Sequence, residues 1–316
     1  MGAIGEVAVD AGASTSSARP IRLTVPEQAA GIRLDRFLAE PLGSRAQAQG
    51  LIDAGLVRVD GRIARKRHPV RPGEAIEVRQ RKRAAAVDDA PAAAFAIAYE
   101  DESLLVVDKP AGVVVHPARG NRTGTLAQAL AGVAAGGEEG WRAGIVHRLD
   151  RNTSGLLVVA KDDAVHRALK QLLQARLLAR EYVTLVEGRM DARTGTIDAA
   201  IGRSRRDRVL MSIESEVARE ARTHFAVQRL LARTTLLRVT LETGRTHQIR
   251  VHMQAIGHPV CGDVNYGGRR MYGLERQFLH AARLRFPHPV TGEEVDVSSP
   301  LPEDLVAALR LAESSG

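Results

Sequence analysis

Apolar and polar positions follow two different patterns along the chain. Between Ile21 and Val78 the apolar runs are short. Helical spacing predicts one helix near Leu34 and a second that ends at Gly55, and alternating valines then predict a strand before a turn at Asp60–Gly61. The pattern therefore predicts two helices followed by a small sheet.

Beyond Phe95 the periodic segments are longer. Strands are predicted at Leu104–Val107, Gly155–Ala160, Glu181–Val186, Thr223–Val227, Leu236–Leu241 and Glu294–Val297. Helices are predicted near Thr125–Val133, Asp162–Leu178, Thr246–Ile256 and Glu303–Leu311. Strands grouped between helices indicate a mixed α+β domain with a largely antiparallel sheet, preceded by the small α/β module.

Composition suggests where these domains begin and end. We expect a disordered tail over residues 1–20, the small domain over 21–79, a linker over 80–94 and the large domain over 95–316. The tail lacks a basic start followed by an apolar stretch, so it is not interpreted as a signal peptide. No apolar run reaches the roughly 20 residues needed to cross a bilayer. We expect a cytoplasmic, monomeric protein without a membrane partner.

Positive charge is concentrated in the small domain. The chain has a formal net charge of +8 and a pI near 10.2, and the segment from Ile21 to Arg83 holds 14 Lys and Arg against 7 Asp and Glu. Such an excess favours a polyanionic partner, most often nucleic acid. The candidate phosphate-binding residues are Arg45, Arg58, Arg62, Arg65, Lys66 and Arg67. The segment SRAQAQGLIDAGLVRVDGRIA, which contains several of them, resembles the S4 RNA-binding domain.

The densest group of reactive side chains lies in GIVHRLDRNTSGLLVVAK, from Gly144 to Lys161. A strand-like run delivers His147, Arg148 and Asp150 to a loop, and a carboxylate beside arginines between buried strands is a reasonable catalytic arrangement. On residue type alone, Asp150 is more often a turn former or an ion-pair partner.

Four blocks change that reading. HRLDRNTSG resembles the active-site motif of the RluA family of pseudouridine synthases. VVDKPAGVVVHP before it, and REYVTLVEG and LETGRTHQIRVHM after it, resemble the family's other blocks in the same order. The resemblance implies an isomerase that acts on structured RNA, within a stem-loop of 23S rRNA or an assembling large ribosomal subunit.

The resemblance also implies roles for individual residues. Asp150 is the catalytic carboxylate, whether by attack on the sugar, proton abstraction or addition to the base. Arg245 is expected to pair with Asp150. Tyr182 is expected to stack on the uracil and to help remove the C5 proton. Arg148 either fills the space left by an extruded uridine or contacts a phosphate. The isomerisation has no redox step and no group donor, so no cofactor is expected.

Other readings are weaker. A non-catalytic S4-type ribosome-assembly factor leaves the four blocks unexplained, and an S4-linked methyltransferase requires a Gly-rich donor loop that is not found. A glycosidase-like hydrolase requires a second carboxylate, which the fold could still bring close. His147 is interpreted as structural, Cys261 as a packing residue, and no metal motif is found.

Overall fold

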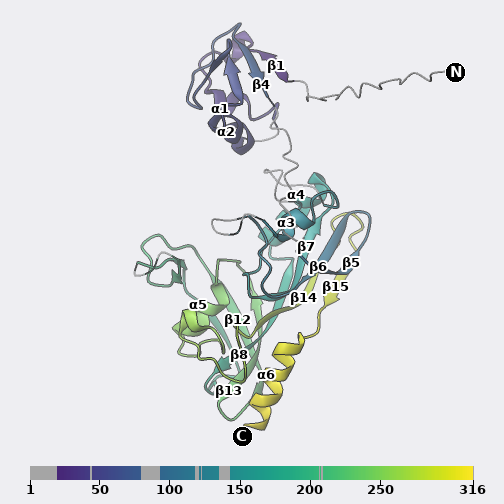
Figure 1. The fold of residues 1–316 in the computed structure, drawn as a ribbon, viewed down its shortest axis with the longest axis vertical. Helices are drawn as coiled ribbons and strands as arrows, with labels where there is room; N and C mark the ends of the chain where they lie inside the picture. Colours follow the sequence, from purple (N-terminus) through teal and green to yellow (C-terminus); the bar gives the residue numbers. More distant parts are fainter. Residues whose placement is uncertain are drawn as a thin grey trace, which may run out of the picture. The chain divides into compact units, whose positions relative to one another are not determined.

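The computed structural model describes residues 20–42, 45–79, 93–117, 121, 123–134, 143–205, 207 and 209–315, with backbone only at 45–47. The chain divides into two compact units, residues 1–88 and 89–316 (Figure 1). The tail expected over 1–20 and the linker expected over 80–94 lie almost entirely outside the described residues.

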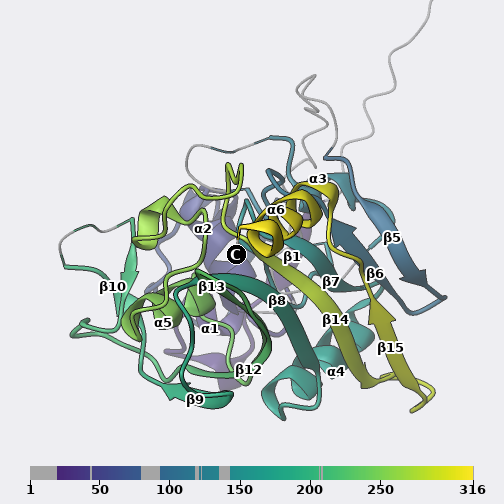
Figure 2. The same cartoon turned by 90° about the horizontal axis from the view of Figure 1, so that it is seen from below.

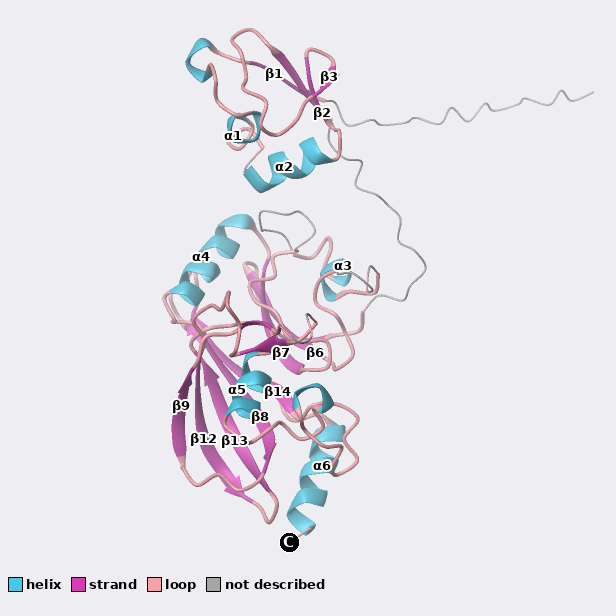
Figure 3. Ribbon diagram, turned by 90° about the vertical axis from the view of Figure 1, so that its left-hand side faces the viewer, coloured by secondary structure: helices cyan, strands magenta, loops and turns pink. Residues whose placement is uncertain are grey.

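The small unit is an antiparallel sheet with two helices on it (Figure 3). Its strands are β1 (Ile21–Thr24), β2 (Val57–Val59), β3 (Arg62–Ile63) and β4 (Ala75–Val78), in the order β1-β4-β2-β3. A 3-10 helix (Glu27–Ala29), α1 (Leu34–Phe37) and α2 (Arg45–Asp53) complete it. Asp60 and Gly61 both have positive φ, as a tight β2–β3 hairpin turn requires.

The large unit is built on a sheet that has nine strands among the described residues. They are β5 (Ala96–Glu100), β6 (Leu104–Lys109), β7 (Ser154–Ala160), β8 (Ala179–Glu187), β9 (Thr194–Asp198), β12 (Arg222–Leu230), β13 (Thr234–Leu241), β14 (Leu279–Pro287) and β15 (Glu294–Ser298). The order is β5-β6-β7-β14-β8-β13-β12-β9, with β15 beside β14. Only the β7–β14 pair is parallel, so the expected largely antiparallel α+β class is confirmed.

Helices cover the two faces of the sheet unequally. They are α3 (Leu126–Ala129), α4 (Asp163–Gln174), α5 (Gln248–Ala255) and α6 (Glu303–Ser314); a hairpin of β10 (Gly202–Arg203) and β11 (Met211–Ser212) and a 3-10 helix (Val264–Tyr266) flank α5. Side chains of α3, α5 and α6 share one apolar core, whereas α4 packs into a second core against the other face (Figure 2). Because both faces of β7 are covered, all seven of its residues are buried, which explains its unbroken apolar sequence.

The pattern of the sequence located most elements but not all of them. The strand β14 in the middle of the sheet and the strands β5 and β9 at the ends of its order were not predicted. The run before Asp150 is not a regular strand either, because only Ile145 forms a bridge, to Val159 of β7. The helix expected over Thr125–Val133 is the single turn of α3, after which Gly132 takes a positive φ.

Candidate active site

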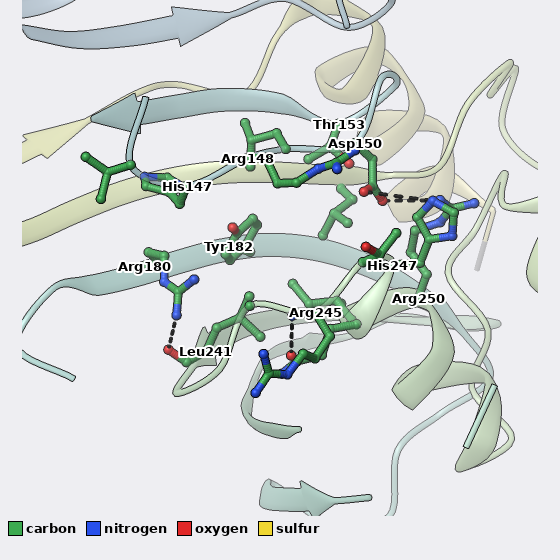
Figure 4. Close-up of a pocket in the computed structure, with 17 residues that line it drawn as sticks. His147, Arg148, Asp150, Thr153, Arg180, Tyr182, Leu241, Arg245, His247 and Arg250 are labelled. Atoms are coloured by element: carbon green, nitrogen blue, oxygen red, sulfur yellow. Dashed lines mark hydrogen bonds and ion pairs between the residues drawn. The ribbon is translucent and has the colours of Figure 1, made fainter. Parts of the chain in front are cut away.

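A cavity of about 240 Å³ opens where four segments of the large unit meet. The HRLD segment, the start of β8, the end of β13 and the loop leading into α5 all contribute side chains (Figure 4). Asp150, Arg148, Tyr182 and Arg245 all line this cavity, so the fold brings together the residues that the sequence singled out from three separate blocks.

Asp150 is held in the cavity by an arginine that the sequence analysis did not single out. Nη1 of Arg250 lies 3.2 Å from Oδ2 of Asp150. The same guanidinium binds Asp263 through Nε at 2.6 Å and Nη2 at 2.8 Å. The side chain of Arg250 is 6% exposed, that of Asp263 2% and that of Asp150 17%. Arg250 therefore bridges two carboxylates. Asp263 is buried, whereas Asp150 is partly exposed, so only Asp150 can be reached by a substrate.

The expected pairing of Arg245 with Asp150 is wrong. Nε of Arg245 donates to the carbonyl of Glu220 at 2.9 Å, and no ion pair among the described residues joins Arg245 to Asp150. Arg245 precedes α5 in the chain, whereas Arg250 lies within it and therefore projects from a fixed helical position. Spacing in the sequence could not tell which of the two arginines pairs with Asp150. The path of the backbone between Arg245 and Arg250 decides where each side chain points.

His247 and Tyr266 complete the surroundings of the carboxylate. His247 takes a left-handed backbone conformation immediately before α5, with Nε2 3.9 Å from Oδ1 of Asp150 and Nδ1 2.7 Å from the Tyr266 hydroxyl. The ring of Tyr266 lies 4.7 Å below the Arg250 guanidinium, close enough for a cation–π contact. Burial lowers the pKa of His247, which favours the neutral ring beside Asp150.

Two buried basic side chains hold the loop that follows Asp150. Nζ of Lys109 donates to the carbonyls of Pro110, Val113 and Arg151 at 2.8, 3.0 and 3.1 Å. Nη1 of Arg276 donates to the carbonyl of Asn152 at 3.1 Å. Burial lowers the pKa of Lys109 to about 7. These contacts fix the backbone on the carboxyl side of Asp150.

Tyr182 is 5% exposed and forms one wall of the cavity. Burial raises the pKa of its hydroxyl, so the phenol stays protonated at neutral pH. Arg148 is exposed and lies next to Asp150 in the close-up (Figure 4). His147 accepts a hydrogen bond on Nε2 from the Val158 amide at 3.3 Å.

The six basic residues singled out in the small unit differ in their surroundings. Arg58 donates to the carbonyl of Gly61 at 3.0 Å, and Nζ of Lys66 lies 3.4 Å from Asp53. Arg62, Arg65 and Arg67 are exposed and take part in none of the ion pairs found among the described residues. The side chain of Arg45, at the start of α2, lies outside the described residues.

Metal ligands do not gather in the described part of the chain, where no group of three or more His, Cys, Asp or Glu side chains could hold an ion. His224 instead contacts Glu242 and Thr196, and His252 contacts Thr223 and the carbonyl of Ala199. Cys261 is fully buried in the core. Within the described ranges, no helix combines the length and apolar character of a membrane span.

Comparison with known proteins gives a consistent picture. A family model described as RNA pseudouridylate synthase matches residues 103–255, and an S4 domain model matches residues 32–76. Ribosomal large subunit pseudouridine synthase D of Nitrosomonas europaea is 42% identical over 311 residues, which cover 95% of this chain and 90% of that protein. RNA pseudouridine synthase YlyB of Bacillus subtilis is 42% identical over 301 residues, which cover 94% of this chain and 99% of that protein.

Solved structures agree with the sequence relatives. Human RNA Pseudouridylate Synthase Domain Containing 1 superposes with a TM-score of 0.52 at 30% identity, over 66% of this chain and 84% of that one. Every residue that lines the cavity around Asp150, except Leu279, lies within the part of the chain that the family model matches. This chain therefore belongs to the RluA family of RNA pseudouridine synthases and is an isomerase with an S4 domain before its catalytic domain.

Proposed function

We propose that this protein converts uridines in a stem-loop of 23S rRNA to pseudouridine, with Asp150 as the catalytic carboxylate. The name of the relative from Nitrosomonas europaea supports a ribosomal RNA target. The observation that carries the assignment is the Asp150 carboxylate itself, which is 17% exposed and held by Arg250 in a cavity. We propose that it acts as a monomer in the cytoplasm.

The reaction needs little besides an oriented carboxylate. The bond between N1 of uracil and C1′ of ribose breaks, and a bond from C5 to C1′ forms. Finally C5 loses its proton and N1 gains one. Atoms and electrons balance without a redox partner or group donor. Asp150 starts this sequence at the nucleotide, and Arg250 keeps its carboxylate aimed into the cavity.

The other residues of the cavity prepare the substrate. The uridine must leave its stack before its glycosidic bond can be reached. Arg148, exposed at the mouth beside Asp150, fills the vacated space in the RNA. Tyr182 stacks on the extruded uracil, and Arg245 contacts the RNA backbone at the rim. Arg45, Arg58, Arg62, Arg65, Lys66 and Arg67 of the S4 domain bind phosphates.

The proposal is tested by Asp150→Asn, which keeps the size of the side chain and removes its charge. We expect pseudouridine formation to stop while RNA affinity stays within about threefold, because the carboxylate acts in the chemistry and does not bind phosphate. Asp191→Asn is the matched control, since Asp191 is exposed and outside the cavity.

The measurement is pseudouridine mapping of rRNA and tRNA from a strain lacking the gene, complemented with each variant, together with RNA binding by the purified proteins. Substantial pseudouridine in the Asp150→Asn strain would refute the role of the carboxylate. Loss of a tRNA site instead of an rRNA site would refute the target.

A further inference from the structure

One end of the cavity carries two N–H donors that have no acceptor in the described structure. Nε of Arg180 and Nδ1 of His147 are both buried and without a hydrogen-bond partner, and both residues line the cavity. Buried donors are normally satisfied, so an unsatisfied pair at a binding site indicates that an acceptor arrives with the ligand.

The protonation of His147 follows from its one contact. The Val158 amide can only donate, so Nε2 of His147 must accept. Burial lowers the pKa of His147 to about 3, so the ring is neutral and carries its single proton on Nδ1. The Nδ1–H group of His147 is therefore a hydrogen-bond donor that has no acceptor in the described structure.

Arg180 is a buried cation that no carboxylate neutralises. Its residue is 4% exposed, and none of the ion pairs among the described residues involves it. Nη2 reaches only carbonyl oxygens, of Leu241 at 3.3 Å and of Glu242 at 3.5 Å. A Cβ at Gly244 would lie 2.6 Å from Nη1, so the bare backbone of Gly244 is what leaves room for the guanidinium.

Tyr182 lies between this donor pair and the catalytic carboxylate (Figure 4). The charges of Arg180 and Asp150 both reach its hydroxyl and shift its pKa in opposite directions. A uracil stacked on Tyr182 with its C1′ at Asp150 must extend away from Asp150. The C4 carbonyl lies across the ring from N1, so its oxygen points to the end that holds Arg180 and His147.

We propose that Arg180 and His147 form the recognition site for the O4 carbonyl of the target uracil and thereby exclude cytosine. This inference rests on the proposed function of the same cavity. Cytosine carries an amino group at that position, which would face two further donors and leave all of them unsatisfied. A site built from hydrogen-bond donors discriminates strongly against a base that lacks the acceptor.

The test replaces single atoms of the substrate. Stem-loop RNAs are built around a uridine that the wild-type protein modifies, with uridine, 2-thiouridine or 4-thiouridine at that position. Sulfur accepts hydrogen bonds weakly, so we expect kcat/KM of the wild-type protein to fall roughly 3- to 10-fold with 4-thiouridine, and clearly less with 2-thiouridine. Arg180→Met is expected to lower kcat/KM on uridine by about 10- to 100-fold and to abolish the extra loss with 4-thiouridine.

The matched control is Arg238→Met, because the Arg238 side chain is 50% exposed, is no part of this cavity, and pairs only loosely with Glu181 at 3.8 Å. It should retain both the activity and the 4-thiouridine loss of the wild-type protein. His147→Phe, which keeps a ring but removes the donor, should reduce the 4-thiouridine loss. If Arg180→Met does not fold, Arg180→Lys is tested in its place. The fall in kcat/KM that 4-thiouridine causes must then be smaller for Arg180→Lys than for the wild-type protein.

Three outcomes overturn the inference. An undiminished 4-thiouridine loss in both Arg180 and His147 variants shows that neither residue contacts O4. The 4-thiouridine loss can also stay undiminished while the Arg180 variant binds RNA more weakly and its plot of log affinity against log salt is shallower by about one unit. That result shows that Arg180 contacts a phosphate. Equal activity of the wild-type protein on all three RNAs shows that O4 is not recognised. Failure of the proposed function is distinct, because the wild-type protein then forms no pseudouridine in any RNA.

Discussion

The guanidinium of Arg250 binds two carboxylates that differ in their exposure to solvent. Asp263 occupies two of its nitrogens in the interior, and Asp150 takes the third at the cavity. Both oxygens of Asp263 are thus engaged behind Arg250, which leaves Asp150 as the acid available to a nucleotide. A planar group with a fixed fork can hold two acids at a set angle, which a lysine cannot do.

Arg250→Met is expected to be far more damaging than Arg245→Met. Loss of Arg250 leaves Asp263 buried without a partner, so the free energy of unfolding should fall by about 3–5 kcal/mol. The turnover rate should fall roughly 100-fold, because Asp150 loses its orientation. Arg245→Met removes one bond to a carbonyl, so the free energy of unfolding should change by about 1 kcal/mol or less.

Urea unfolding and single-turnover rates on the same RNA measure the two effects. Arg250→Lys serves as a control for charge, since it keeps the cation but loses the fork, and it should recover only part of the rate. An Arg245→Met protein that loses more turnover than Arg250→Met would restore Arg245 as the partner of Asp150 and contradict the geometry.

The close approach of β7 and β14 positions the active-site loop in the sheet. Gly155, at the start of β7, pairs with Ala281 of β14 in the parallel register and has a φ of +110°. A Cβ there would lie 2.2 Å from the carbonyl oxygen of Ala281 and 2.7 Å from its nitrogen. One backbone turn separates Asp150 from this contact. In that turn the amide of Thr153 donates a hydrogen bond to the carbonyl of Asp150 at 3.1 Å.

Gly155→Ala should destabilise the large unit by more than about 3 kcal/mol, because backbone atoms cannot move aside as a side chain can. Gly292→Ala is the matched control: Gly292 also has a positive φ, of +75°, but nothing lies within 4 Å of a Cβ there. It should cost about 1 kcal/mol, from backbone strain alone. Thermal and urea unfolding compare the two variants, and equal losses would mean that the β7–β14 contact is not tight.

At the scale of the molecule, the proposed phosphate contacts and the proposed chemistry lie in separate compact units. The S4 unit has its own apolar core, distinct from the cores of the large unit. Its exposed arginines at 62, 65 and 67 are not neutralised by ion pairs among the described residues. Each phosphate that an arginine neutralises releases counterions, so a contribution of these arginines to RNA binding is measurable through its dependence on salt.

Replacement of Arg62, Arg65 and Arg67 by Ala is expected to weaken RNA binding and to make the plot of log affinity against log salt shallower by up to about three units. Turnover of bound RNA should stay close to wild type, because the cavity is in the other unit. Arg22→Ala combined with Arg79→Ala is the control, since both arginines pair with Glu77. An unchanged salt slope in the triple variant would remove these arginines from the RNA contact.

The sequence by itself determined the fold class and, through four blocks, the family. Periodicity located β6, β7, β8, β12, β13 and β15, because alternation and unbroken apolar runs follow directly from burial on one or two faces. It missed the edge strands β5 and β9, and also β14, whose segment mixes the buried His280 with the exposed Arg283 and Arg285. The block around Asp150 was recognisable from its residues, but its strand-like run is an irregular segment that is bridged to β7 only through Ile145.

Only the tertiary structure decided which side chains meet. Arg245 and Arg250 stand five positions apart in one block, and the left-handed residue His247 and the start of α5 turn them in different directions. Asp263, in the loop after α5, and Lys109, at the end of β6, lie far from Asp150 in the chain and reach its surroundings only through the packing of the domain. Local sequence sets the backbone periodicity, but the direction of a side chain and its distant partners follow from the packing of the whole domain.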